Sequence, residues 1–95
     1  MSLFVVKHQH SAETCPAGDP QMGPMLAQHV SQPGAEQFGL NLKGEAVVDG
    51  AHTLFLIVEG ERENIDRFMA PFTQVGSVEV LPSSLCEQVV ARAQC

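Results

Sequence analysis

The sequence contains no tryptophan, no tyrosine and few basic residues. Only 5 of the 95 residues are Lys or Arg, against 11 Asp or Glu, so the formal net charge is −6. Phosphate backbones and anionic membrane surfaces are bound by clustered positive charge, which this chain lacks. We therefore expect neither nucleic acid nor a membrane as a partner. Hydrophobic residues make up 44% of the chain and charged residues 17%, which excludes a disordered acidic chain.

Long apolar runs are also absent. Near the N-terminus the uncharged apolar stretch covers only residues 3–6, which is too short for a signal sequence or a membrane span. We therefore expect a cytoplasmic protein, and the length predicts a single domain spanning residues 1–95. The three cysteines are an odd number, so a disulfide framework is unfavourable and the thiols should be free or bound to metal. CxxC, GxSxG and phosphate-binding glycine-rich motifs are missing.

The hydrophobic pattern predicts strands and helices in the order β-α-β-β-α-β, followed by a tail helix. β-Branched and aromatic runs indicate the strands, Asp49-Gly50 is a hairpin turn, and apolar residues at i, i+3, i+4 and i+7 mark the second helix. The first helix should end at Gln32-Pro33-Gly34, and Pro82 should end the last strand. The expected strands are residues 3–10, 38–48, 52–59 and 77–81; the expected helices are residues 24–31, 62–72 and a tail from about 84.

This order predicts an α+β fold of the ferredoxin-like type, with an antiparallel sheet and both main helices on one face. Strand 52–59 is apolar on both sides, since Phe55 and Ile57 alternate with three other apolar residues. A sheet face that is exposed and apolar is usually covered by a second copy of the chain. We therefore predict a homodimer whose sheets pack face to face. The alternative is that the tail helix folds under the sheet of its own chain.

The order and patterning resemble the dimeric α+β barrel superfamily of ferredoxin-like folds. The chain is most similar in appearance to small bacterial single-domain members, some of which are similar to nickel-binding proteins. The resemblance covers nearly the whole chain, but it is carried by pattern and not by a sharp motif. It implies a dimer, and a function ranging over cofactor-free monooxygenases, haem-associated enzymes, metal binders and regulatory modules.

The segment 8–15 carries the chemistry that is most typical of a site. His8 and His10 are two residues apart on a strand, so both imidazoles point to the same face, and Cys15 follows in a loop that Pro16 stiffens. Two imidazoles and a thiolate suit Zn, Ni or Cu, with one coordination position left for water. HxH is common by chance, so the competing interpretation is that both histidines simply end a strand.

The predicted geometry offers two further candidate ligands, Glu59, which could also act as a general base, and Cys86. The simpler interpretations are a solvated carboxylate at a strand end for Glu59 and a packing or inert thiol for Cys86. If strand 52–59 runs parallel to the first strand, Glu59 lies near His8 and His10 while His52 lies at the far end. Cys86 opens the tail helix and can reach the site only from a second subunit. Met22 and Met25 would add soft ligands but are more simply core residues, and His29 is expected to be a buried or half-buried structural histidine.

The leading hypothesis is therefore a small transition-metal-binding protein for storage, sensing or delivery. The first alternative is a module or enzyme that binds an apolar small molecule between the sheets, with His8 or His10 as acid or base. The second is a metal-free dimeric interaction module. The sequence supports a binding protein more than an enzyme, and it does not identify the metal.

Overall fold

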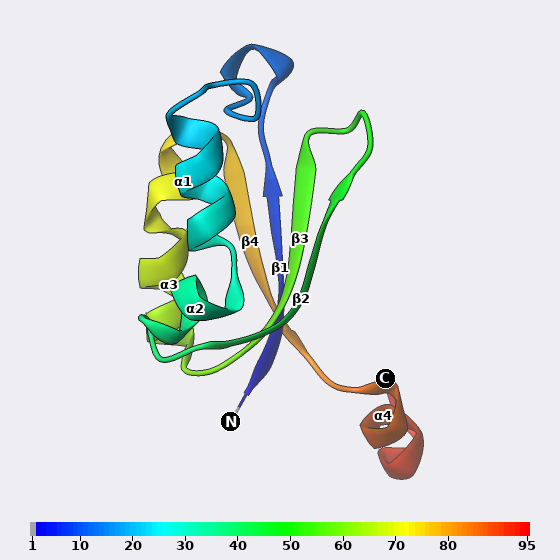
Figure 1. The fold of residues 1–95 in the computed structure, drawn as a ribbon. Coiled ribbons are helices and arrows are strands. Elements are labelled where there is room, and N and C mark those ends of the chain that lie inside the picture. Colours follow the sequence, from blue (N-terminus) through cyan, green and yellow to red (C-terminus); the bar gives the residue numbers. More distant parts are fainter. Residues whose placement is uncertain (1) are drawn as a thin grey trace.

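The computed structural model describes residues 2–95 and shows a mixed α+β fold. A four-stranded antiparallel sheet has the order β2-β3-β1-β4, and α1, α2 and α3 cover one of its faces (Figure 1). This arrangement is compatible with the ferredoxin-like fold that the element order predicts. The strands are β1 (Leu3–Gln9), β2 (Asn41–Val48), β3 (Thr53–Glu59) and β4 (Ser77–Ser83). The α-helices are α1 (Met22–His29), α2 (Gln32–Glu36), α3 (Arg62–Met69) and α4 (Cys86–Arg92), and the 3-10 helices are η1 (Ala12–Thr14) and η2 (Ala70–Gln74).

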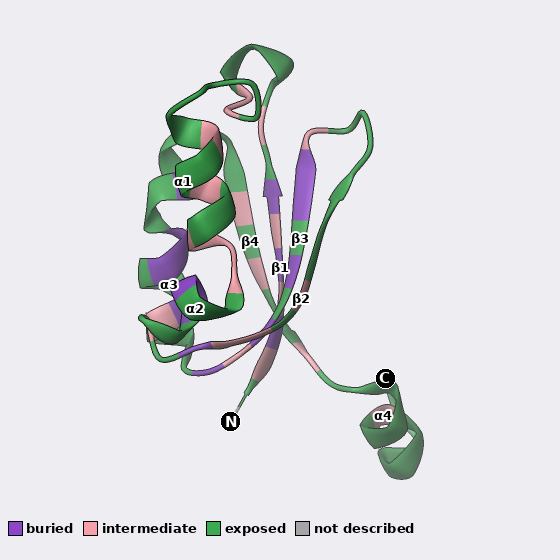
Figure 2. Cartoon of the chain, in the orientation of Figure 1, coloured by how far each residue is buried: buried purple, intermediate pink, exposed green. Residues whose placement is uncertain are grey.

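The core lies between the sheet and the helices, where the sequence pattern places it. Alternate residues of β1 and β3 are buried, and α3 contributes the apolar stripe that its spacing predicts (Figure 2). Burial of these side chains removes apolar surface from water and holds the two layers together. The fully buried large side chains are Val6, Leu56, Val58, Ile65, Phe68 and Met69.

β3 runs antiparallel to β1, so the expectation of a parallel pair is wrong. Leu3 lies opposite Glu59 and Gln9 lies opposite Thr53. The helical connection after β1 makes β2 parallel to β1 but not its neighbour, and the hairpin then reverses the chain into β3. The beginning of β3 therefore lies beside the end of β1.

The first helix ends before Gln32, as predicted, whereas the predicted break at Pro82 does not end the last strand. Pro33 lies in the first turn of α2, where the missing N–H costs nothing, and Ser31 caps this helix by accepting a hydrogen bond from the Gly34 N–H at 3.2 Å. Pro82 lies inside β4, which the sheet order makes an edge strand and which therefore tolerates proline. Among residues 2–95 no helix has the length and apolar character needed to cross a membrane.

The tail helix α4 does not fold under the sheet. It projects away from the remaining structure, and none of its residues is buried (Figures 1 and 2). The face of the sheet opposite the helices consequently stays open. Phe55, Ile57 and Leu81 on this face are 36%, 43% and 44% exposed. We call these three residues, with Lys7 and Glu79, the open sheet face.

Gly76 allows the chain to enter β4 directly beside the end of β1. Its φ is +104°, and a Cβ atom at this position would overlap the backbone carbonyl oxygen of Gln9. We expect Gly76→Ala to lower the free energy of unfolding by about 3 kcal/mol or more, because it adds a backbone clash to an unfavourable φ. Denaturant unfolding followed by circular dichroism measures this loss.

Gly18→Ala is the matched control for this prediction. Gly18 is exposed, and a Cβ atom there would meet nothing within 4 Å. We expect its free energy of unfolding to change by about 0.5 kcal/mol or less. Equal stability of the two variants would contradict the account of Gly76.

Candidate metal centre

Three segments meet at one end of the sheet. The end of β1, the loop that follows it and the β2–β3 hairpin all lie at this end, opposite the end from which α4 leaves (Figure 1). They bring together His10, Cys15 and His52, whose ligand atoms all lie within 4.8 Å of one another. We call these three residues the His-Cys-His cluster.

His10 follows β1 and points to the same side of the sheet as His8, as the spacing predicts. The backbone N–H of His10 donates a hydrogen bond to the His52 carbonyl oxygen at 3.1 Å, so the antiparallel ladder extends to both residues. Both ring nitrogens of His10 are buried, and neither has a hydrogen-bond partner among the residues that the structure describes. Buried polar atoms are normally paired, so these two nitrogens require an explanation.

His52 ends the hairpin that begins at Asp49-Gly50. Its φ is +50°, a left-handed conformation that is uncommon for a residue with a side chain. The ring centres of His10 and His52 are 5.2 Å apart and the rings meet edge to face. Strained backbone of this kind is concentrated at functional sites.

Cys15 reaches the cluster from the loop. The short helix η1 reverses the chain after β1, and the Cys15 N–H donates to the Ala12 carbonyl oxygen at 3.4 Å. Cys15 itself is extended, at φ −67° and ψ 121°, as expected for the residue before a proline. Its thiol is free and half-buried. The loop therefore presents a cysteine close to the sheet, as the sequence predicts for this residue.

His8 lies beside the cluster and is held by other contacts. Its Nδ1 is 3.1 Å from the Ser77 carbonyl oxygen, which fixes Nδ1 as the donor, and its ring packs edge to face on Phe72 at 5.0 Å. The ring centres of His8 and His10 are 5.5 Å apart. His8 therefore supports the ring of His10 from the core side and is not among the three clustered ligands.

Burial and neighbouring imidazoles lower the pKa of His8 and His10, which favours the neutral form of both rings. Burial lowers the pKa of His8 below 6.5, and the nearby His10 adds to this, although the bond to Ser77 acts in the opposite sense. Burial also lowers the pKa of His10, with a further contribution from His52. A neutral imidazole has a free lone pair, which is the form that binds a metal ion.

The structure places the other two expected ligands elsewhere. Glu59 is opposite Leu3, so the length of β1, about 20 Å, separates it from the cluster. It accepts a hydrogen bond from Asn41 Nδ2 at 3.0 Å and forms an ion pair with Lys43 at 3.6 Å. Cys86 is exposed on α4. Within one chain, neither residue joins the His-Cys-His cluster.

A groove of about 800 Å³ opens beside the cluster and includes all three of its residues in its lining. It lies on the helix-covered side of the sheet, between α1 and the β2–β3 hairpin. Its walls are mainly apolar, and Glu45 and Asp49 lie on the hairpin side. The apolar wall residues include Leu26, Val30, Val47, Leu54, Phe72 and Val75.

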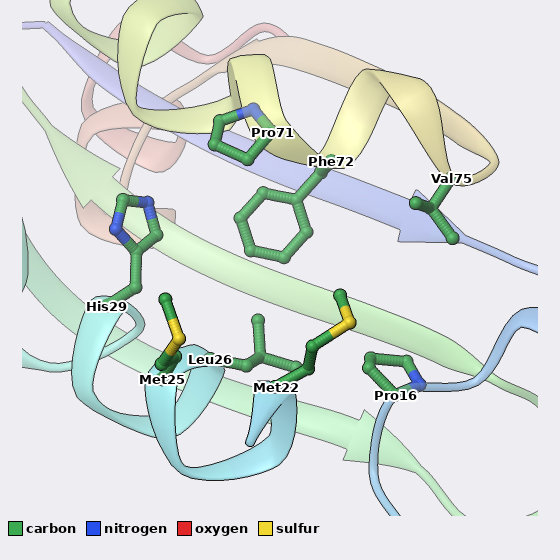
Figure 3. A pocket seen from close by; sticks show the side chains of 8 residues that line it. All are labelled: Pro16, Met22, Met25, Leu26, His29, Pro71, Phe72 and Val75. Carbon is green, nitrogen blue, oxygen red and sulfur yellow. The ribbon is translucent and has the colours of Figure 1, made fainter. Parts of the chain in front are cut away.

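A smaller hollow of about 270 Å³ lies between α1 and η2 (Figure 3). Met22 and Met25 line it and are exposed, so they do not fill the core. His29 also borders this hollow, and it is the half-buried structural histidine that the sequence predicts. Its ring stacks on Phe68 at 4.3 Å, and its Nε2 donates to the Phe68 carbonyl oxygen at 2.8 Å.

Reasoning from the sequence did not place His52 in the site. The signal was present, because the Asp49-Gly50 turn predicts a hairpin and the predicted sheet is antiparallel. These two facts together place the first residue of β3 beside the last residue of β1.

Comparisons with protein families, curated proteins and solved structures found no match to this chain.

Proposed function

We propose that the protein binds one transition-metal ion through His10 and His52 nitrogens and the Cys15 thiolate, for storage, sensing or delivery. The observation that carries the proposal is the buried, unpartnered imidazole of His10, one nitrogen of which lies within 4.8 Å of a ligand atom of Cys15 and of His52. This nitrogen bound to a metal ion would no longer be an unpaired buried atom.

The donor set determines which ions fit. Two imidazoles and one thiolate are borderline to soft ligands, which favours Zn²⁺, Ni²⁺ or copper over Mg²⁺ and Ca²⁺. Tetrahedral zinc with bonds of about 2.0–2.3 Å holds its ligand atoms about 3.5 Å apart, so modest side-chain rotations would complete the site. Three protein ligands leave a fourth position for water or another molecule.

A metal titration tests the proposal. Purified chain, stripped with a chelator, is titrated with Co²⁺ and then with Zn²⁺. We expect one Co²⁺ per chain, a thiolate-to-cobalt absorption band, and displacement of cobalt by zinc. A chain that binds no Co²⁺ and no Zn²⁺ above the level of a chelator blank would overturn the proposal and leave the two alternatives that need no metal, a small-molecule-binding module or enzyme and a dimeric interaction module.

We also propose that two copies of the chain pair through the open sheet face. Three exposed apolar residues on this face support the proposal, as does the position of α4, which leaves them uncovered. Lys7 lies directly opposite Glu79 on the same face, so the face carries both signs of charge. A two-fold pairing that sets Lys7 of one copy against Glu79 of the other would match these charges. This dimer uses the sheet, while the metal site lies at the end of the sheet on the helix-covered side.

A further inference from the structure

The groove beside the cluster is continuous with the proposed metal site. His10, Cys15 and His52 all belong to its lining, so a molecule bound in the groove would lie beside all three potential ligands. Its volume of about 800 Å³ is within the range of about 300–1,000 Å³ that is usual for small-molecule sites. A three-ligand metal beside a pocket of this size is the arrangement found in sites that accept an exogenous ligand.

We propose that this groove binds a small organic molecule with a hydrocarbon body and one neutral metal-binding head group, such as an imidazole or a thioether. The head group takes the fourth position on the metal and the body lies along the apolar wall. This inference rests on the proposed metal site and names the class of ligand that the site accepts.

The wall of the groove sets the preference for a hydrocarbon body. Leu26, Val47 and Phe72 come from α1, β2 and η2, so apolar side chains face the groove from three elements. Four residues of the wall, Pro16, Leu26, Phe72 and Val75, also line the smaller hollow beside Met22 and Met25 (Figure 3). Methionine side chains are flexible and adapt to apolar guests of different shape. The apolar surface therefore extends beyond the immediate surroundings of the metal.

The charges in the groove exclude an anionic body. The described lining contains the carboxylates of Glu45 and Asp49 and neither Lys nor Arg. An anionic group away from the metal would thus meet charge of its own sign, without a cation to pair with. Nucleotides, sugar phosphates and dicarboxylates do not fit this pattern, whereas a neutral molecule does.

The test uses cobalt-loaded protein and three probes that share an imidazole head group, two of them neutral and one anionic. Imidazole, 4-phenylimidazole and 4-(4-carboxyphenyl)imidazole are titrated while the cobalt absorption spectrum is followed. We expect 4-phenylimidazole to bind at least about ten-fold more tightly than imidazole, equivalent to about 1.4 kcal/mol. We expect the carboxylated probe to lose most of this gain.

A groove-filling variant provides the structural control. Ala27 is exposed on α1 and lines the groove, and Gln28 is its exposed neighbour outside the lining. We expect Ala27→Phe to abolish the preference for the phenyl group with cobalt affinity unchanged, and Gln28→Phe to keep both. If the protein does not bind cobalt, both the metal site and the groove proposal are wrong. If it binds cobalt but binds imidazole and 4-phenylimidazole with equal affinity, the groove proposal alone is wrong. The same holds if the carboxylated probe binds as tightly as 4-phenylimidazole.

Discussion

Cys15→Ser, His10→Ala and His52→Ala are each expected to weaken zinc binding by about 100-fold or more. Loss of an outer-shell partner alone typically costs about 10–100-fold, and each of these substitutions removes one of the three protein ligands. The folded structure supplies all three ligands at once, because two are joined through the backbone bond between His10 and His52 and the third follows after one short loop. Competition with a chromophoric chelator measures the affinities, and Cys15→Ser should also lose the thiolate-to-cobalt absorption band.

Two control substitutions test whether weaker zinc binding comes from the loss of a ligand or from the loss of any thiol or carboxylate. Cys86→Ser removes an exposed thiol on α4, and Glu59→Gln removes a carboxylate at the opposite end of β1. Both are expected to bind zinc within about two-fold of the original chain, as for residues far from the metal. Equal losses in these controls and in the ligand variants would show that zinc binds elsewhere.

Ile57→Glu is expected to convert a dimer into a folded monomer. Ile57 lies opposite Val5 on the open sheet face, so a glutamate there would be desolvated on pairing without a cation directly opposite it. Charge of this kind in an apolar contact weakens association by about 100-fold or more, since burying it costs several kcal/mol. Light scattering at micromolar concentration should give twice the chain mass of 10.2 kDa for the original sequence and 10.2 kDa for the variant.

The matched control for the dimer is Met25→Glu. Met25 is 69% exposed on α1, and α1 covers the face of the sheet opposite the open sheet face (Figure 1). This variant carries the same change of charge and should remain dimeric, with unchanged circular dichroism. A monomeric mass for the original chain at micromolar concentration would contradict the proposed pairing.

The spacing of apolar residues predicts most of the fold, because within each strand or helix it indicates which side chains are buried. The alternation along β3 and the stripe of Ile65, Phe68 and Met69 on α3 both follow from side-chain period, and both are buried as expected. The end of the first helix before Pro33 is predicted correctly, but the new helix that Pro33 begins and the continuation of β4 through Pro82 are not. The effect of a proline depends on its position: the first lies in a first helical turn, and the second lies on a sheet edge. Edge position is a property of the whole sheet and is absent from the local sequence.

The candidate site could be predicted only in part, for a related reason. His10 and Cys15 are near each other in the sequence, so a short loop is enough to suggest that they meet. His52 is distant, and its place depends on the direction of one strand. If the direction of β3 is predicted wrongly, Glu59 takes the place of His52 in the predicted site, because His52 precedes β3 and Glu59 is its last residue. The burial of His10 depends likewise on contacts from several elements.

The order of the three ligands along the chain has a consequence for biosynthesis. His10 and Cys15 leave the ribosome early, whereas His52 follows only after α1, α2 and β2 have been made. In the proposed site, the nascent chain would first offer an ion two donors that are close together in the sequence, and the third would join them when the hairpin pairs with β1. The chain would then bind a metal ion with full affinity only after the central strands have paired in the correct register. An ion bound before that point would still exchange with solvent.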